Sequence, residues 1–290
     1  MCQGTPHTPI SIAHLTVLEA SPPELAVLAR GAGAEMVGLR LVPVTSEERP
    51  WPLATDKMLR RATMAALAET GIDVLDVELV KLTPGFNAAE WEPILATAAE
   101  LGARRVLTQV HDPNLPRAAE AYRDLCERAE PYGLTCDIEF LTWTEIWNVE
   151  TAAAFIGAAN HPQSGLCIDA LHFFRSNCRP EEIEGLPSKW LHFAQVCDAP
   201  AESPTTRDGL IGAARGERLL PGEGDAPLVE IIARLPPGTP LALEVPNAEM
   251  ARRMQPQERV SAAVSALRRT LAAVEAERGS QPSARNAASG

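Results

Sequence analysis

The chain has 290 residues, of which 46% are hydrophobic, and it carries a formal net charge of −12 at pH 7. This length fits one large domain or two small ones, and the composition can supply a sizeable core. Because nucleic acids and anionic membranes are bound by basic surfaces, the negative charge argues against both as main partners.

The sequence shows no targeting or membrane signal. Its first ten residues, MCQGTPHTPI, lack the basic and apolar regions of a signal peptide. It contains no run of about 18 apolar residues, the length that spans a membrane. The six cysteines are scattered without a CxxC pair, so we interpret them as free thiols in a reducing compartment. These observations predict a cytoplasmic protein.

Apolar runs along the chain predict eight β-strands. They comprise residues 10–17, 36–42, 73–82, 105–110, 134–141, 165–171, 191–196 and 241–246. Segments with the three-to-four spacing of helices separate them. The first helix is expected at Pro22, after Ser21 as a candidate N-cap. Further helices are predicted over 88–103, 116–132, 148–159, 226–234 and 255–277, with one or two turns in 180–187.

Eight strands that alternate with helices imply a parallel sheet, because parallel neighbours need crossover connections. Eight repeats in this length predict the α/β class and a closed (β/α)8 TIM barrel with eight parallel strands. An open doubly wound sheet is the alternative, but it usually has a glycine-rich first turn, and the sequence has no GxGxxG or P-loop. We expect a single barrel domain over residues 9–276, a flexible N-terminus over 1–8 and a disordered tail over 277–290.

Polar residues interrupt four consecutive apolar runs near their ends. In TIM barrels the chemistry lies at the carboxyl ends of the strands, so these side chains are expected to point into one mouth. Carboxylates crowded in a low-dielectric mouth repel each other unless a cation is present. Hard oxygen ligands favour Mn²⁺ or Mg²⁺, with Co²⁺ or Zn²⁺ possible. The sequence therefore predicts one divalent metal held by Glu139, Asp169, Gln195 and Glu244.

Two polar residues follow this set closely. His172 lies three residues after Asp169, which is compatible with an acid, a base, a substrate donor or a structural histidine. Asp198 lies three residues after Gln195 and is expected either to orient other groups or to cap the following loop.

The segment 199–225 is long for a connection in a barrel and is predicted to be a lid or a substrate clamp. Arg218 sits before its Pro-Gly turn, where it would suit a carboxylate-bearing or hydroxyl-rich substrate, or would be a solvated charge. Other residues that could line the mouth are Glu78, Lys81, His14 and the tryptophans Trp143 and Trp147.

Five motifs give the chain a resemblance to a known family. They are DIEFL (137–141), CIDALH (167–172), FAQVCDAP (193–200), RLLPGEGDAPL (218–228) and ALEVPN (242–247). With these motifs, residues 10–275 resemble the xylose isomerase-like TIM-barrel superfamily. That group includes sugar-phosphate isomerases/epimerases, ketose 3-epimerases, inosose dehydratase and 3-dehydroshikimate dehydratase.

The resemblance implies a role for each matched residue. It implies that Glu139, Asp169, Gln195 and Glu244 hold the metal, that His172 contacts the substrate and that Arg218 reaches it. Gln195 stands where many epimerases of the group have His, and it resembles the bacterial 3-dehydroshikimate dehydratases. The stretch VELVKLTPG (77–85) offers Lys81 as its only cation where that dehydratase has an arginine, which argues against a carboxylate-bearing substrate.

The family chemistry is removal of a proton next to a carbonyl, with a metal that stabilises the enediolate. The resemblance thus implies an isomerase or epimerase of a small keto-sugar or polyol, with Glu139 and Glu244 as the acid–base pair. From their positions near strand ends, Glu78 and Trp143 are expected as further substrate contacts, although Trp143 would also suit packing against a helix. A dehydratase, with His172 as acid or base, is the alternative. A non-catalytic ligand-binding barrel and a relative of endonuclease IV are further alternatives; the latter needs a histidine-rich site, and the chain has six His. The expected partner is a small molecule, and a homo-oligomer is possible.

Overall fold

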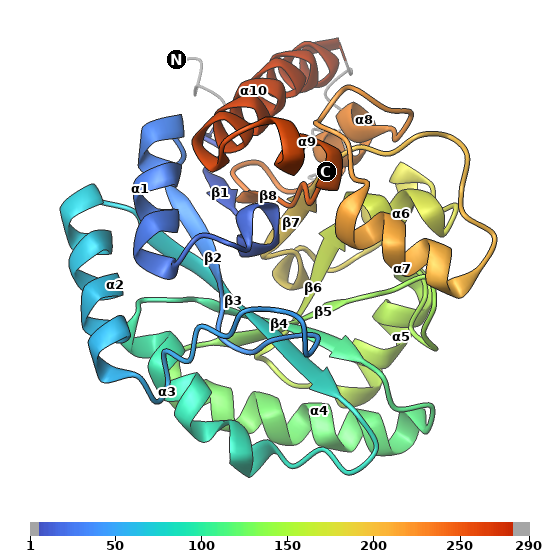
Figure 1. The fold of residues 1–290 in the computed structure, drawn as a ribbon. Coiled ribbons are helices and arrows are strands. Elements are labelled where there is room, and N and C mark those ends of the chain that lie inside the picture. Colours follow the sequence, from blue (N-terminus) through green and yellow to red (C-terminus); the bar gives the residue numbers. More distant parts are fainter. Residues whose placement is uncertain (1–5, 281–290) are drawn as a thin grey trace, which may run out of the picture.

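The protein forms a closed barrel of eight parallel strands in a computed structural model that describes residues 6–280 (Figure 1). Each strand pairs with the next in chain order, and β1 also pairs with β8. The predicted TIM barrel is therefore confirmed. The strands are β1 (Ile10–Ile12), β2 (Met36–Arg40), β3 (Asp73–Leu82), β4 (Arg105–Val110), β5 (Thr135–Glu139), β6 (Ser164–Asp169), β7 (Phe193–Val196) and β8 (Leu241–Leu243).

Helices surround the barrel on its outside (Figure 1). They are α1 (Pro22–Ala32), α2 (Lys57–Thr70), α3 (Glu92–Glu100), α4 (Leu115–Ala129), α5 (Val149–Ala159), α6 (Ala170–Arg175), α7 (Arg207–Gly216), α8 (Leu228–Arg234), α9 (Ala248–Arg253) and α10 (Pro256–Ser280). None of the helices in the described part of the chain has the length and apolarity that a membrane span requires.

The helix boundaries follow local capping chemistry. Asp56 begins α2 by accepting hydrogen bonds from the amides of Met58 and Leu59. Asn148 begins α5 with a capping box in which the Thr151 amide donates to its side chain. Helix α1 ends at Gly33, whose φ of 78° lies in the left-handed region that glycine adopts at low cost.

The structure differs from the sequence prediction in several connections. The run 10–17 is a three-residue strand followed by a 3-10 helix, His14–Val17. Helix α7 lies inside the segment predicted as one long loop, because Thr206 caps it by accepting a hydrogen bond from the Gly209 amide. Helices α2 and α9 were not predicted. The predictions for residues 1–5 and 281–290 lie outside the described residues, and α10 runs to Ser280.

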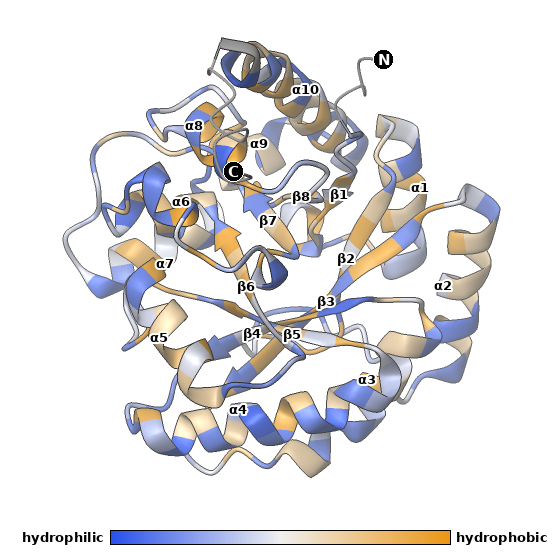
Figure 2. Cartoon of the chain, turned by 180° about the vertical axis from the view of Figure 1, so that it is seen from behind, coloured by the Kyte–Doolittle hydropathy of each residue, from blue (hydrophilic) through white to orange (hydrophobic). Residues whose placement is uncertain are grey.

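The barrel interior is a packed core separate from the layer between strands and helices. An inner cluster contains Leu75, Leu79, Leu107, Cys167, Phe193 and Ala242, whereas the larger apolar cluster combines residues of the strands with residues of the helices. Figure 2 shows many hydrophobic residues in the strands and a mixture of hydrophobic and hydrophilic residues in the helices. Because side chains alternate along a strand, the residue two positions after an inward residue also points inward. Three of the predicted site residues follow inner-core residues at this spacing, in the pairs Cys167 and Asp169, Phe193 and Gln195, and Ala242 and Glu244.

Candidate active site

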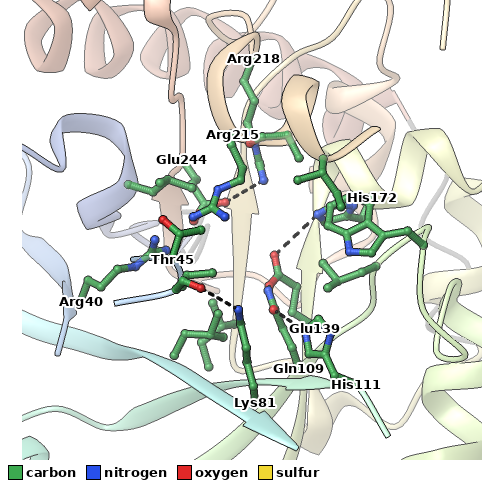
Figure 3. A pocket seen from close by; sticks show the side chains of 18 of the residues that line it. Arg40, Thr45, Lys81, Gln109, His111, Glu139, His172, Arg215, Arg218 and Glu244 are labelled. Carbon is green, nitrogen blue, oxygen red and sulfur yellow. Dashed lines mark hydrogen bonds and ion pairs between the residues drawn. The ribbon is translucent and has the colours of Figure 1, made fainter. Parts of the chain in front are cut away.

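The carboxyl ends of the strands surround a cavity of about 330 Å³ (Figure 3). This volume lies at the lower end of the range for small-molecule sites. Its wall combines apolar side chains with an unusually large share of charged ones. Its polar and aromatic lining residues are Arg40, Thr45, Lys81, Gln109, His111, Glu139, Trp143, His172, Arg207, Arg215, Arg218 and Glu244.

Three buried residues form an acidic cluster at one side of this cavity. Glu139, Asp169 and His172 place atoms that can bind a metal within 4.8 Å of one another. Asp169 ends β6 and begins α6, where its Oδ1 accepts a hydrogen bond of 3.1 Å from the His172 amide. The His172 Nε2 lies 3.9 Å from Glu139 Oε1, and the Trp143 ring meets the imidazole edge-on at 5.0 Å between centroids.

Arg218 connects this cluster to the last strand. Its guanidinium lies 2.6 Å from Asp169 Oδ2 and 2.9 Å from Glu244 Oε2, and all three residues are buried. Gln195 completes the link because its Nε2 donates to Glu244 Oε1 at 3.0 Å. The four residues predicted as metal ligands, together with His172 and Arg218, thus lie in one connected network.

Burial dominates the electrostatics of this network. It raises the pKa of Glu139 to about 8, with a further contribution from the charge of Asp169. Burial also raises the pKa of Glu244 well above its usual value. Burial raises the pKa of Asp169 as well, but the charges of Arg218 and His172 outweigh it and the net pKa is lowered. Burial lowers the pKa of His172 to about 4, so its imidazole is neutral at pH 7.

The donor set fits a divalent cation. Carboxylate oxygens and a neutral imidazole are ligands for Mn²⁺, Mg²⁺, Co²⁺ or Zn²⁺. The Nδ1 of His172 is buried and has no hydrogen-bond partner among the described residues. A cation would favour the ionised form of Glu139 that burial opposes. The carboxylates that Arg218 contacts keep further lone pairs, since each offers about four.

Several polar residues of the cavity were missed by the sequence analysis. Gln109 donates from Nε2 to Glu139 Oε2, and its own Oε1 lies 3.1 Å from His111 Nε2. Gln109 interrupts the apolar run RVLTQV in the same way as the four predicted residues, so that signal was available. Arg40 likewise interrupts MVGLRLV. Arg207 and Arg215 lie in α7, within the expected loop.

Other residues singled out in the sequence lie away from the cavity wall. Glu78 is buried behind Arg40, which donates to its Oε2 at 2.7 and 3.0 Å, and Arg40 lines the cavity instead. His14 is held by the Arg40 amide at 3.1 Å and by the Ala20 carbonyl at 2.9 Å, as expected for a structural histidine. The Trp147 side chain is exposed.

Asp198 anchors the connection that follows β7. Its carboxylate accepts hydrogen bonds from the amides of Ala199, Gly222 and Ala226, at 2.8 to 3.0 Å. Of the two roles expected for Asp198, the structure therefore shows the loop cap. This anchoring fixes the segment that carries Arg218, since Leu219 and Asp198 also pair through their backbones.

Part of the chain is similar in sequence to one enzyme. It is 28% identical over 135 residues to a 3-dehydroshikimate dehydratase of Pseudomonas putida, which amounts to 43% of this chain and 20% of that protein. The chain thus spans about a fifth of the length of this relative.

Solved structures share the fold at low sequence identity. A fusion protein of a xylose isomerase-like TIM barrel with 4-hydroxyphenylpyruvate dioxygenase matches with a TM-score of 0.76 and 20% identity, covering 96% of this chain and 45% of that one. The IOLI protein, solved with a zinc atom, matches with a TM-score of 0.71 and 19% identity, and the match covers 94% of this chain and 100% of that one. D-psicose 3-epimerase of Clostridium cellulolyticum, solved with D-tagatose, matches with a TM-score of 0.70 and 14% identity, and the match covers 92% of this chain and 99% of that one.

The profile of one family, described as the xylose isomerase-like TIM barrel, matches residues 27–270. This match covers most of the described chain, including every strand from β2 to β8. The closed eight-stranded barrel agrees with it. The chain therefore belongs to the xylose isomerase-like TIM-barrel family.

Proposed function

We propose that this protein is a divalent-metal-dependent enzyme that moves a proton next to the carbonyl of a small hydroxylated substrate, as an isomerase or epimerase. The observation that carries the proposal is the buried cluster of Glu139, Asp169 and His172 at the barrel mouth. A bound Mn²⁺ or Mg²⁺ would supply a Lewis acid that polarises the carbonyl and stabilises the enediolate. The zinc atom in the IOLI protein supports a metal of this kind.

Glu139 and Glu244 are the proposed acid–base pair. Both line the cavity, and Figure 3 shows them on different sides of it. One carboxylate would remove the proton and the other would return it on the opposite face of the substrate carbon. Gln109 holds Glu139, and Arg218 with Gln195 holds Glu244, so each carboxylate has a fixed orientation.

A metal-dependent dehydratase is the second candidate. The neutral His172 imidazole would remove the proton beside the carbonyl, and the enolate would then expel a β-hydroxyl group that leaves as water with the proton now on His172. The similarity to the Pseudomonas putida 3-dehydroshikimate dehydratase favours this reaction. Trp143 packs against the His172 ring and would help to exclude water from this donor.

The test begins with metal-loaded protein. Elemental analysis after dialysis with Mn²⁺ should give about one metal per chain. Incorporation of deuterium from D₂O beside the carbonyl of a panel of ketoses would establish the isomerase or epimerase. An ultraviolet rise with 3-dehydroshikimate that requires the metal would establish the dehydratase. Metal binding without either reaction would instead support a ligand-binding barrel.

Glu244→Gln is the decisive variant. It should lower turnover by about 10²- to 10⁴-fold, because it removes a proton-transferring carboxylate but keeps the shape of the side chain. Circular dichroism should show the wild-type fold. Glu249→Gln, on exposed α9, is the matched control and should keep wild-type turnover. Full activity in Glu244→Gln would refute the assigned role.

A further inference from the structure

The cavity contains more positive than negative charge. Two carboxylates line it, Glu139 and Glu244, against five basic side chains. The five are Arg40, Lys81, Arg207, Arg215 and Arg218. This excess is unexpected in a chain with a net charge of −12, so it is a local property of the mouth. A cleft lined by one sign of charge concentrates ligands of the opposite sign.

Three of the five cations are neutralised by the protein itself. Arg218 is paired with Asp169 and Glu244. Arg40 is paired with Glu78 at 2.7 Å and with Glu48 at 3.4 Å. Arg215 forms an ion pair with the same Glu48. These arginines therefore hold the wall of the cavity together and carry little charge that is free for a ligand.

Lys81 and Arg207 are the other two basic side chains that line the cavity. Lys81 lies near the end of β3, is partly buried and donates from Nζ to the Val44 carbonyl at 3.2 Å. Arg207 is the first residue of α7 and is exposed at the rim of the cavity. Within residues 6–280, no ion pair involves either side chain.

The two free cations act on the same part of the cavity. Burial, together with the smaller effects of the charges of Lys81 and Arg207, lowers the pKa of His111 to about 4. Burial also lowers the pKa of Lys81, assisted by the charge of Arg215. The neighbourhood of His111 is thus a region of positive potential. Figure 3 shows Lys81 and His111 on the side of the cavity away from Arg218.

We propose that Lys81 and Arg207 form a subsite for an anionic group of the substrate, a carboxylate or a phosphate. The inference rests on the proposed function, because it adds an anionic group to the substrate whose proton Glu139 and Glu244 would move. The anion would supply the counter-charge that the two side chains lack. The substrate class is then a small hydroxy-keto acid or a sugar phosphate, and not a neutral ketose. Arg207 lies in α7, so the segment that follows β7 would recognise the charged end of the substrate.

The test compares pairs of probes that differ in charge, by calorimetric titration of Mn²⁺-loaded protein at low salt. Shikimate and its methyl ester form the carboxylate pair, and D-ribose 5-phosphate and D-ribose form the phosphate pair. We expect the anionic member of one pair to bind about tenfold tighter or more than its neutral partner. The pair that shows the difference identifies the kind of anion. The difference should shrink as salt screens the exposed Arg207.

Variants assign the effect to these residues. Arg207→Gln and Lys81→Gln should each reduce the preference for the anion, and the double variant should abolish it. Arg252→Gln, on exposed α9, is the matched control and should keep the full preference. Equal binding of both members of each pair, no binding of either anionic probe, or a preference that survives in the double variant would each overturn the subsite.

The readouts separate this proposal from the proposed function. Metal content and deuterium incorporation test the reaction, whereas the ratio of the two affinities in each pair tests the subsite. If the protein binds metal and incorporates deuterium but binds the charged and neutral probes equally well, the subsite alone is refuted. Protein that prefers anions but binds no metal would refute the metal-dependent reaction alone.

Discussion

The two ends of the barrel both contain acidic and basic side chains, but only those at one end line the cavity of the candidate active site. In the mouth, Glu139, His172 and Arg218 line the cavity, and the buried Asp169 is paired with Arg218. The opposite end, which we call the barrel floor, contains Arg105, Thr135, Asp137 and His192. Each cluster combines acid, base and hydrogen-bonding groups inside the same barrel, but none of the floor residues lines the mouth cavity.

The floor residues form a hydrogen-bonded network centred on Asp137. His192 Nδ1 and Thr135 Oγ1 each lie 2.6 Å from a different oxygen of Asp137. Arg105 donates to Thr135 Oγ1 at 3.3 Å. Gly165 leaves room for the pair, since a Cβ there would collide with both Asp137 and His192. Both oxygens of Asp137 are thus satisfied, and the buried Arg105 Nε has no hydrogen-bond partner among the described residues. The mouth keeps a His172 nitrogen without a partner, and it also has the cavity that the floor residues do not line.

The comparison shows that buried charge alone does not identify a functional site. A buried ion pair can be purely structural when its hydrogen-bonding capacity is used within the protein. A site additionally needs space for a ligand and groups whose capacity is left over. The mouth has both, and the following experiments test whether this distinction holds.

The largest expected difference is in activity. Glu139→Gln should reduce turnover about 10²- to 10⁴-fold and leave the fold intact, because its carboxylate transfers a proton. Asp137→Asn lies one inward position earlier on β5 and should keep wild-type turnover per folded molecule, while unfolding becomes easier by about 1 to 3 kcal/mol. Deuterium incorporation and urea denaturation measure the two effects. Similar losses of turnover in both variants would contradict the claim that only the mouth is a catalytic site.

A packing change at the floor should affect stability only. Gly165→Ala places a methyl group against Asp137 and His192 and should cost about 1 to 3 kcal/mol of unfolding free energy. Gly157→Ala in α5 is the matched control, because a Cβ there meets nothing within 4 Å and alanine favours helix. Thermal unfolding in parallel would measure both. A Gly165→Ala protein as stable as wild type would contradict the close contact.

The smallest expected effect is a pH dependence confined to the mouth. In metal-free protein the folded pKa of Glu139 is raised to about 8, above its unfolded value, so the folded state binds more protons between these values. Stability should therefore fall as pH rises from 6.5 to 8, by about 2 kcal/mol at most. Urea unfolding with a chelator at several pH values would measure it. Glu139→Gln should flatten the curve, and an unchanged slope would contradict the assignment.

Much of the fold was predictable from the sequence because strands buried on both faces are apolar throughout. The predicted runs 73–82 and 105–110 coincide with β3 and β4. Strand ends were overestimated where the apolar run continues into a helix or a turn, as after Ile12 and Asp169. Helix α2 was not predicted because few of its residues are buried, so the helical spacing of its apolar residues is weak.

The site was predictable where one strand supplies one polar residue at its end, as with Glu139 and Glu244. Groups whose position depends on packing between distant segments could not be predicted in this way. Arg215 reaches Glu48 from α7, and no local pattern predicts that pairing. The sequence offered Lys81 as a lone cation beside strand three, but folding brings Arg40, Arg207 and Arg215 to the same cavity, which removes that argument against an anionic substrate.

The position of β8 between β7 and β1 has a consequence for the newly made chain. Strand β1 pairs with β8, and Thr16 Oγ1, shortly after β1, donates to the carbonyl of Leu243, 227 positions later in the sequence. The pairing of β1 on this side can therefore form only after β8 has been synthesised. Chains emerge from the ribosome with the N-terminal part first. Until β8 arrives, the sheet has two open edges, which are prone to pair with other chains. Glu244 directly follows β8, so the step that closes these edges also brings Glu244 to Arg218 and completes the buried network of the mouth.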